Sequence, residues 1–535
     1  MLTLDDVKRG ARFAWELPPL LRRPLDTEQA KAALARRLAG RENEFLALMK
    51  RAVYGQAESP YRALLGLAGC EYGDLERLVR RDSVEGALGQ LLRHGVYLTV
   101  EEFKGRRPVR RGSAEVAVIR RGLRNPGSTA RIEGMTSGSR GVPTPVPIDV
   151  TYVRAWAENL RLQLEARGGL GWAKAYWATS SGTSIAWLVC YAAAGLPLAR
   201  WFSPIDPRSP ELPALYRASA RLLPWVGFMA GARLPRPEHA PLGEPTTILR
   251  WMADVLRSGG TPYLVGYGSA LVRLCEAARD SGVELAGARV HAVGEPLTAT
   301  RLGALREARV GVSVSYGSAD VGPLAYSCLS PEAPDDVHLF HDLVAVIQPE
   351  PGKGAGPRPR SLLVSTLSGA APLVLLNVSL GDEAIRTERR CRCPLERLGW
   401  ITHLHTIRSY EKLTAGGMTF LDADLVRVLE ETLPARFGGG PMDYQLVEQE
   451  GAGGRPVLRL LVHPRVGPLD AAALVAAFLR AIGARSDGER VMELVWREAD
   501  LVAVERRPPL ATTSGKILHL HIESPGPSAS VRIPL

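Results

Sequence analysis

The chain lacks the features that would place it in a membrane or mark it for export. Its longest apolar run, residues 185–199, is interrupted by Gly195 and Pro197 and is too short to span a bilayer. The N-terminus, MLTLDDVKRGARF, has no basic start followed by an apolar core, so no secretory signal peptide is evident. We therefore expect a cytoplasmic protein without a membrane span.

Cysteine is scarce and scattered, which argues against a disulfide framework. The cysteines are Cys70, Cys190, Cys275, Cys328, Cys391 and Cys393. Free thiols at such spacings are typical of a reducing compartment. Only the last two are closely spaced, as Cys391-Arg392-Cys393.

The sequence also lacks a nucleic-acid-binding signature. It has 67 Lys and Arg against 56 Asp and Glu, a formal net charge of +11. A basic face for nucleic acid interleaves Lys and Arg with aromatic residues, and the densest basic run, KGRRPVRRG at 104–112, contains none. One explanation for part of the excess of Arg is the base composition of a genome. A mildly basic protein also suits anionic small molecules such as nucleotides and coenzymes.

The length and the pattern of apolar residues predict an α/β protein of several domains. A chain of 535 residues is too long for a single core, and 46% apolar residues is ordinary for a globular protein. Residues 1–110 have helical periodicity. Residues 111–407 alternate short β-branched runs with amphipathic helical stretches, which predicts a large domain with mainly parallel strands and a β-rich subdomain at 336–405.

A second, smaller domain is expected after a boundary near Arg408. Residues 408–523 show a compact α+β pattern, in which RVMELVWREAD at 490–500 is predicted as a strand. The Pro- and Ser-rich tail, residues 524–535, is expected to be loose.

A Ser-, Thr- and Gly-rich loop, TSGSRGVPT at 136–144, suggests a phosphate site. Small residues let the backbone approach an anion closely, and hydroxyl groups and Arg140 can donate hydrogen bonds to phosphate oxygens. The loop has no Gly-Lys pair and so is not a P-loop, and a plain surface loop is the alternative. A similar segment at 180–184 could also bind an anion, but we expect it to be a helix N-cap.

Two further segments carry suggestive chemistry. Tyr316-Gly317 ends a β-branched strand, where the ring can stack on a planar base, and Asp320 follows four residues later as a carboxylate that can hold Mg²⁺. Lys516 lies in a Thr-Ser-Gly turn before an alternating strand, from which it can be presented to a phosphate or carboxylate. Alone, each segment also fits an ordinary turn.

Together, and in this order, the three segments resemble the adenylate-forming acyl-CoA synthetase superfamily over about residues 115–520. The sequence is most similar to phenylacetate-CoA ligase-like proteins and their acyl-protein synthetase relatives. In that branch the phosphate loop also ends in Pro-Thr, as Pro143-Thr144 does here. The resemblance implies the superfamily's large N-terminal domain and a small, mobile C-terminal domain.

The resemblance also implies roles for individual residues. Lys516 and Asp320 would be catalytic, with Asp320 holding Mg²⁺. Gly416 and Gly417 would face the incoming thiol, and Tyr267 would line the acyl pocket. The ATP- and AMP-binding residues would be Thr136, Ser137, Gly138, Ser139, Arg140, Gly141, Gly294, Glu295, Pro296, Ser315, Tyr316, Gly317, Ser318, Asp382 and Arg408.

The activity implied is that of an acid-thiol ligase. It would use ATP and Mg²⁺ to convert an aryl or acyl carboxylic acid to an acyl-adenylate, and would then transfer the acyl group to coenzyme A. A protein thiol or an amine is the alternative acceptor. Ala319 and Asp320 depart from the family's Thr/Ser-Glu pair, so a nucleotide-binding protein without turnover is a third alternative.

A structural zinc site is implied as well. Some phenylacetate-CoA ligase-like proteins hold zinc with a set that corresponds here to Cys328, His338, Cys391 and Cys393, and Cys₃His is a set that Zn²⁺ accepts. Reduced free thiols are the alternative, and His341 competes with His338. His403 and His405 alternate on a predicted strand, where we expect edge residues and not ligands.

Overall fold

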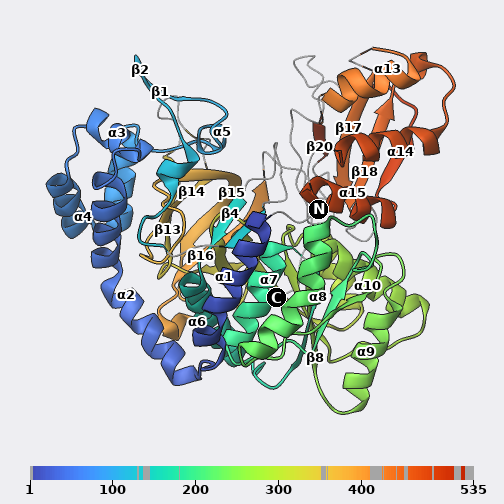
Figure 1. The fold of residues 1–535 in the computed structure, drawn as a ribbon, viewed down its shortest axis with the longest axis horizontal. Helices are drawn as coiled ribbons and strands as arrows, with labels where there is room; N and C mark the ends of the chain where they lie inside the picture. The colour runs from blue at the N-terminus through green and yellow to red at the C-terminus, as the bar shows by residue number, and fades with distance from the viewer. Residues whose placement is uncertain are drawn as a thin grey trace, which may run out of the picture.

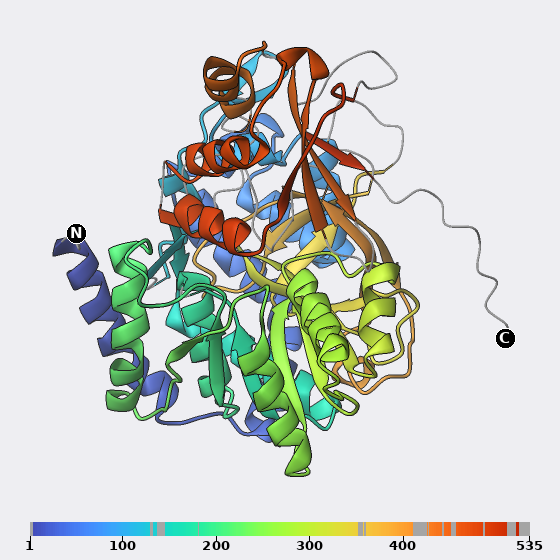
Figure 2. The ribbon, with the colours of Figure 1, turned by 90° about the vertical axis from the view of Figure 1, so that its right-hand side faces the viewer.

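The structure of the protein is a computed structural model. Its helices surround one large sheet (Figures 1 and 2). The structure describes residues 4–128, 132–135, 145–179, 181–350, 357, 360–409, 425, 427–440, 443–450, 456–484, 487–510 and 520–523. All six cysteines lie in these ranges and are free, as expected.

Half of the large sheet is parallel. Its strands are β5 (Ala173–Trp177), β6 (Arg200–Ser203), β7 (Pro237–His239), β8 (Pro262–Tyr267), β9 (Arg289–Val293) and β10 (Gly311–Ser318). Every pairing among them is parallel. Short apolar runs separated by helices form such strands because both faces of a parallel sheet are buried.

Helices cover both faces of this parallel half. They are α6 (Val150–Ala166), α7 (Gly182–Ala193), α8 (Ala214–Met229), α9 (Thr246–Arg257), α10 (Gly268–Asp280) and α11 (Ala299–Glu307). Successive strand residues point to opposite faces. Tyr176 therefore packs with α6 and α7, whereas Trp177 packs with α9 and α10.

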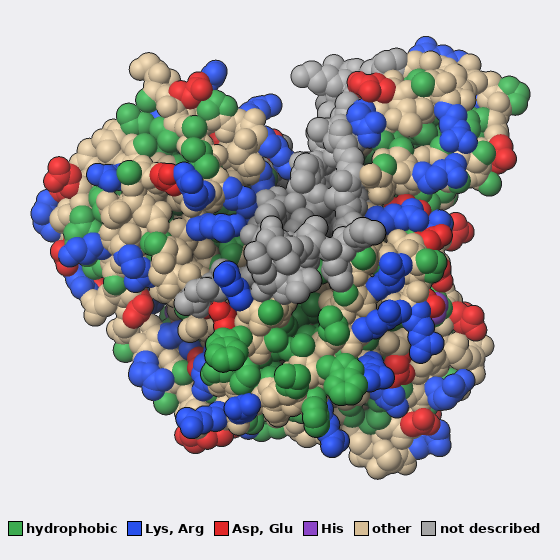
Figure 3. All heavy atoms as spheres, viewed as in Figure 1, with side chains coloured by type: hydrophobic (Ala, Val, Ile, Leu, Met, Phe, Trp, Pro, Cys, Tyr) green, Lys and Arg blue, Asp and Glu red, His purple; other side chains and the backbone are tan. Residues whose placement is uncertain are grey.

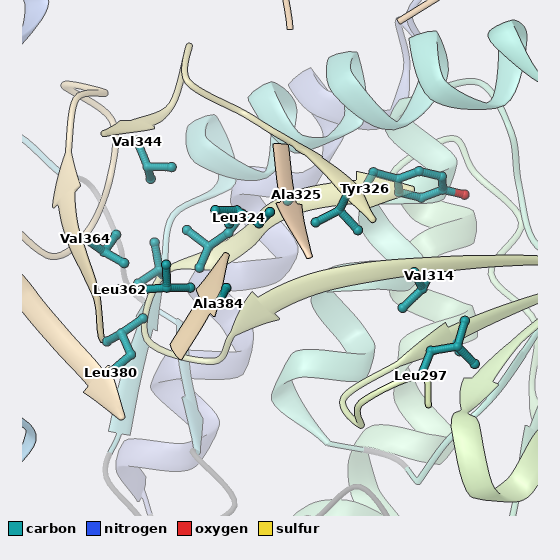
Figure 4. Packing of buried hydrophobic residues seen from close by; sticks show 14 of the residues in the cluster. Leu297, Val314, Leu324, Ala325, Tyr326, Val344, Leu362, Val364, Leu380 and Ala384 are labelled. Atoms are coloured by element: carbon teal, nitrogen blue, oxygen red, sulfur yellow. The ribbon is translucent and has the colours of Figure 1, made fainter. Parts of the chain in front are cut away.

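The other half of the sheet is antiparallel. It comprises β11 (Gly322–Ser327), β12 (Val337–Leu339), β13 (Val344–Ile347), β14 (Ser361–Thr366), β15 (Val378–Glu388) and β16 (Thr402–Ser409), with the 3₁₀ turn η3 (Glu396–Leu398) before β16. In the described residues the strand order is β13-β14-β15-β16-β12-β11-β10-β9-β8-β5-β6-β7. Strand direction reverses where β10 turns into β11. Apolar side chains from both halves, including Val314, Leu324 and Leu380, pack into one core (Figure 4).

The N-terminal part is helical, as predicted. It contains α1 (Leu4–Leu21), α2 (Thr27–Met49), the π-helix η1 (Lys50–Tyr54), α3 (Pro60–Leu67), α4 (Tyr72–Arg93) and α5 (Val100–Phe103). Short elements follow: β1 (Val109–Arg111), β2 (Ala114–Val116), η2 (Arg120–Leu123), and the paired β3 (Ile132–Met135) and β4 (Pro145–Ile148).

Asn377 attaches this helical part to the sheet. It precedes β15, is fully buried and has a φ of 51°, a left-handed conformation that Asn tolerates better than most residues. Its Nδ2 donates to the carbonyl oxygens of Leu88 (2.9 Å) and Val96 (3.1 Å). Its backbone N–H donates to Ser365 Oγ at 2.8 Å.

A second, four-stranded sheet of order β19-β18-β17-β20 lies in the C-terminal part. Its strands are β17 (Tyr444–Glu450), β18 (Pro456–Val462), β19 (Val502–Glu505) and β20 (Leu520–Glu523), and the helical elements beside them are η5 (Val428–Thr432), α13 (Leu433–Phe437), η7 (Pro464–Val466), α14 (Ala471–Ile482) and α15 (Asp487–Glu498). The α/β class is therefore confirmed, with a large sheet that has a parallel half and a β-rich antiparallel half, and with a small α+β unit. The domain boundaries proposed from the sequence stay predictions.

The prediction of a strand at 490–500 is wrong, because residues 490–498 form the end of α15 and a turn follows. Val491, Leu494 and Val495 are buried and recur at three- and four-residue steps, which is the period of a helix. The strand of this region is β19, directly after it. Among the described helices, none is long and apolar enough to cross a bilayer.

Replacing Asn377 with Ala should lower the free energy of unfolding by about 2–4 kcal/mol, because two buried carbonyls lose their donors and Ala is strained at this φ. Chemical unfolding of the full chain measures the effect. Asn43→Ala, at an exposed position, is the matched control and should change stability by less than about 0.5 kcal/mol. Equal stability of the two variants would contradict the attachment.

Candidate functional site

The candidate site lies where β10 turns into β11. The strands pair from Ser315 to Ser318 with a bulge at Tyr316 and Gly317. A Cβ atom on Gly322 would lie 2.1 Å from the Trp156 ring, and Gly322 has a φ of 89°. Only glycine fits such a position, so the turn and the helix that carries Trp156 are held in close contact.

Tyr316 and Asp382 meet at this turn, although 66 residues separate them in the sequence. The Tyr316 hydroxyl donates a hydrogen bond to Asp382 Oδ2 at 2.9 Å. Asp382 lies on β15, opposite Ser409 of β16, and is mostly buried. Tyr316 and Asp382, which the resemblance assigned to one nucleotide site, are therefore adjacent.

Asp320, which the resemblance assigned to Mg²⁺, forms ion pairs with two basic side chains. Its Oδ2 lies 2.6 Å from Lys104 Nζ, and its Oδ1 lies 3.5 Å from Arg120 Nη2. The carboxylate is 9% exposed. Nothing in the sequence near Asp320 indicated these partners, because Lys104 and Arg120 lie about 200 residues earlier in the N-terminal part.

The side chain of Glu295 is held by hydrogen bonds and an ion pair with nearby residues. Its carboxylate accepts hydrogen bonds from Ser269 N and Oγ, both at 2.8 Å, and pairs with Arg301 at 3.1 Å. This holds the start of α10 beside the end of β9. The ring of Tyr267 lies against Gly294, where a Cβ atom would come within 3.0 Å of it. Burial raises the pKa of Tyr267 to about 12, so its hydroxyl stays protonated.

Arg408 points to a carboxylate that organises the end of β16. Its Nη1 lies 3.0 Å from Asp335 Oδ2. The same carboxylate accepts hydrogen bonds from the backbone N–H groups of Thr406 and Ile407, each at 2.8 Å. The proposed contact of Arg408 with ribose or phosphate stays a prediction.

An aromatic cavity lies between α6, α7 and the sheet, beside Ser315. Trp156, Trp187, Tyr176 and Tyr326 contribute to its wall. Tyr176 is buried, and both Tyr176 and Trp187 line this space. Gln163 reaches the cavity as well, with a buried Nε2 that has no hydrogen-bond partner among the described residues.

His291, which the sequence did not single out, is the titratable group of this cavity. Its Nδ1 lies 2.9 Å from Ser313 Oγ and its Nε2 lies 3.1 Å from Ser315 Oγ. Its ring stacks on Tyr326 at 4.6 Å. Burial, together with the charge of Arg167, lowers the pKa of His291 to about 3, so the imidazole is neutral.

The second Ser-rich segment is a helix cap, as expected. Ser181 Oγ accepts a hydrogen bond from the backbone N–H of Ser184 at 3.2 Å, at the start of α7. The hydroxyl that could have faced an anion thus satisfies one of the helix's own N–H groups.

A cluster of Cys and His side chains lies between β11, β12 and β16. One ligand atom from each of Cys328, His338, Cys391 and His403 lies within 4.8 Å of every other. Cys393 belongs to the same group, since its Sγ lies 3.2 Å from His338 Nε2. A hydrogen bond from the Cys328 thiol lowers the pKa of Cys393 below its usual value and favours the thiolate. This donor set fits a metal ion, and Zn²⁺ in particular.

Both histidines are oriented by a second partner, as metal-bound imidazoles usually are. His338 Nδ1 lies 2.7 Å from the carbonyl oxygen of Trp400, and His403 Nδ1 lies 2.8 Å from Asp336 Oδ1. Within the part of the chain that the structure describes, His403 Nε2 is buried without a hydrogen-bond partner. The prediction that His403 is an edge residue is therefore wrong, because β16 lies between β12 and β15. Its alternation with His405 identified the strand but not its neighbours.

Several predicted residues lie outside the described ranges. They are Thr136, Ser137, Gly138, Ser139, Arg140, Gly141, Gly416, Gly417 and Lys516. Their roles stay predictions.

Comparison with known proteins supports the fold. No family model matches the chain, and no curated protein matches its sequence. It is similar to the crystal structure of 2-hydroxyisobutyryl-CoA ligase in complex with 2-HIB-AMP and CoA in the thioesterification state, with a TM-score of 0.55, 17% identity and coverage of 91% of this chain and 92% of that one. The chain thus shares its overall fold with this ligase.

Weaker matches include an amide bond synthetase from Marinactinospora thermotolerans, with a TM-score of 0.41, 14% identity and coverage of 89% of this chain and 93% of that one. Another is acetoacetyl-CoA synthetase from Streptomyces lividans, with a TM-score of 0.34, 14% identity and coverage of 74% and 55%.

The neutral His291 should make stability depend on pH. Between its native pKa of about 3 and its ordinary value of 6.5, the unfolded chain binds a proton that the folded chain does not. Lowering the pH from 7 to 5 should therefore remove about 2 kcal/mol of unfolding free energy through this group. His291→Gln should lose that pH dependence, whereas His94→Gln, at an exposed position, should keep it. Urea unfolding at both pH values measures the difference in unfolding free energy. The same difference in His291→Gln as in the wild type would contradict the assignment.

Proposed function

We propose that the protein activates a carboxylic acid with ATP and transfers the resulting acyl group to a thiol, with coenzyme A as the expected acceptor. The hydrogen bond between Tyr316 and Asp382 carries this proposal. It joins two residues that the resemblance assigned to the nucleotide, in a chain that shares its fold with 2-hydroxyisobutyryl-CoA ligase. The two side chains would hold the nucleoside end of ATP beside the carboxyl ends of the parallel strands, a usual place for ligands in such folds.

The chemistry would proceed in two steps. A carboxylate oxygen of the acid attacks the α-phosphorus of ATP, the bond to the β-phosphate breaks, and pyrophosphate leaves. The thiol then loses its proton and attacks the acyl carbon, and AMP leaves. Both substrates of the first step are anions, so the protein must supply positive charge before they can meet.

The residues outside the described ranges have the roles that the resemblance implies. The loop from Thr136 to Gly141 would bind the departing pyrophosphate, and Lys516 would stabilise charge between the carboxylate and the α-phosphate. Rotation of the small C-terminal domain would then withdraw Lys516 and present Gly416 and Gly417 to the thiol.

An aryl acid of the phenylacetate kind is the acid we favour. The cavity beside Ser315 is walled by Trp156, Trp187 and Tyr326, and aromatic side chains suit an aromatic ring. Its volume of about 20 Å³ admits little more than a water molecule, so these side chains would have to move apart to admit the acid. Ser315 belongs to the predicted nucleotide segment, so an acid in this cavity would have its carboxylate near the α-phosphate. Tyr267 stays a predicted wall residue.

ATP–pyrophosphate exchange across a library of carboxylic acids tests the proposal. Exchange that depends on one class of acid supports adenylation, and no exchange with any acid would leave only a nucleotide-binding protein. Lys516→Ala should reduce exchange by about a thousandfold while ATP still binds, because the lysine acts on developing charge. Exchange at the wild-type rate in that variant would refute its role. A thioester of coenzyme A, detected by mass, separates this acceptor from a protein thiol or an amine.

We also propose that the Cys and His cluster holds a structural zinc ion. Cys328, His338, Cys391 and Cys393 are the ligands that the resemblance implies, and His403 is the further candidate added by the geometry. Such an ion would join β11 and β12 to the turn before β16. It takes no part in the reaction steps above.

The zinc proposal predicts about one zinc ion per chain after purification without chelators. The double variant Cys391→Ser, Cys393→Ser should lose it and should melt roughly 5 °C lower or more. Cys70→Ser, which changes a buried free thiol outside the cluster, should retain the metal. Elemental analysis and thermal unfolding provide the two readings. A wild-type chain without zinc, with a melting temperature unaffected by chelators, would contradict the proposal.

A further inference from the structure

Lys104 and Arg120 converge on Asp320 beside the proposed nucleotide site. The distances to its two carboxylate oxygens are 2.6 and 3.5 Å, and both cations come from parts of the chain that precede or begin the resemblance. The Asp320 side chain is 9% exposed, Lys104 is 16% exposed and Arg120 is 25% exposed. The carboxylate is thus covered, while both cations still reach solvent.

Backbone hydrogen bonds fix the segment that carries Lys104. Leu98 N donates to Asn377 O at 3.1 Å, and Ser379 N donates to Leu98 O at 2.9 Å, so the segment before α5 is fixed to the start of β15. Thr99 then caps α5 with a capping box. Lys104 follows directly as the last residue of that turn, which brings its side chain to the site.

Arg120 is anchored in the same way to the connection between β14 and β15. Val374 N donates to Leu123 O at 2.8 Å in the turn that Arg120 begins. The side chain of Asn125 donates to the carbonyl oxygens of Gly369 and Ala371, both at 2.8 Å. Two independent anchors therefore aim positive charge at one point.

This arrangement does not fit Asp320 as a magnesium ligand. Mg²⁺ requires near-octahedral oxygen ligands and usually one or two carboxylates. Each Asp320 oxygen already has a cationic partner, and a divalent ion placed there would lie within contact distance of two like charges. The departure from Glu to Asp in the sequence motif agrees with this, because the shorter side chain stays within reach of Lys104.

The arrangement fits an anion better. An ammonium group has three N–H donors and a guanidinium has five, so each kind of group can bind a carboxylate and a second anion at the same time. Arg forms bidentate pairs with phosphate, and Lys binds it as a point charge. Asp320 compensates one of the two positive charges and orients both. Lys and Arg side chains also gather on the surface over α5 and the neighbouring ends of β14 and β15 (Figure 3).

We propose that Lys104 and Arg120 form a binding site for the phosphates of the nucleotide, and that Asp320 positions these cations and does not hold Mg²⁺. The identity of the anion rests on the proposed function. The site itself rests on the two ion pairs and their anchors.

Calorimetric binding of inorganic pyrophosphate and of ATP to the full-length chain tests the site, in EDTA and again in excess Mg²⁺. Lys104→Met and Arg120→Met should each weaken the binding of both anions by about tenfold or more in both buffers. Asp320→Asn should leave the Mg²⁺ concentration that half-saturates ATP binding within about twofold of wild type, since a carboxylate that holds no metal sets no metal affinity.

Two further variants guard against a loss of folding. Lys104→Met leaves a buried carboxylate short of a partner, so the double variant Lys104→Met, Asp320→Asn removes both charges and should bind pyrophosphate as weakly as Lys104→Met. Arg121→Met changes the neighbouring Arg, which is 72% exposed and pairs with Glu58, and should bind like wild type.

Three outcomes separate the ideas. Wild-type anion binding in Lys104→Met and Arg120→Met would overturn the site. A rise of about tenfold in the Mg²⁺ requirement of Asp320→Asn, with a fall in that of Lys104→Met, would restore Asp320 as the metal ligand and also overturn it. Anion binding that depends on both cations in a wild-type chain with no exchange activity would support the site and defeat the proposed adenylation instead.

Discussion

The reversal of strand direction between β10 and β11 is the constraint on which the rest of the site depends. Parallel strands deliver their carboxyl ends to one edge of the sheet, which brings Tyr267, Gly294 and Tyr316 to neighbouring positions. The antiparallel strands beyond the reversal then return the chain to the same edge, and so place Asp382 beside Tyr316. A sheet that stayed parallel throughout would need a helical crossover here and could not make this contact with so short a turn.

Close packing fixes the reversal in place. The Trp156 ring occupies the space where any side chain at position 322 would lie, and Gly317 is similarly crowded by the Gly322 carbonyl oxygen. Buried charges near the turn are paired, as burial requires: Asp320 with Lys104 and Arg120, and Glu295 with Arg301. The Asp320 pairs tie the turn to the N-terminal part of the chain, whereas Glu295 ties the segment after β9 to α10 through its hydrogen bonds with Ser269.

Sequence reasoning predicted the parts of this structure that depend on local pattern. Alternating β-branched runs and amphipathic stretches identified the α/β class, and Ser181 identified the start of α7. It failed where tertiary contacts determine a residue's surroundings. Lys104 and Arg120 pair with Asp320 across about 200 residues of sequence. The strands on either side of β16 determine that His403 is buried. The error at α15 is different, since the helical period of its apolar residues was present in the sequence and its β-branched content was given too much weight.

The Cys and His cluster and the nucleotide edge are joined by one strand. Asp336 holds His403 near the start of β16, and its neighbour Asp335 holds the backbone of Thr406 and Ile407 farther along. The strand then reaches Ser409, which lies opposite Asp382. A metal in the cluster would therefore restrain β16 at its beginning, while the adjacent aspartates carry that restraint toward the site. A structural ion here would serve to keep the Asp382 partner strand in register, which is a use of zinc that needs no contact with the substrates.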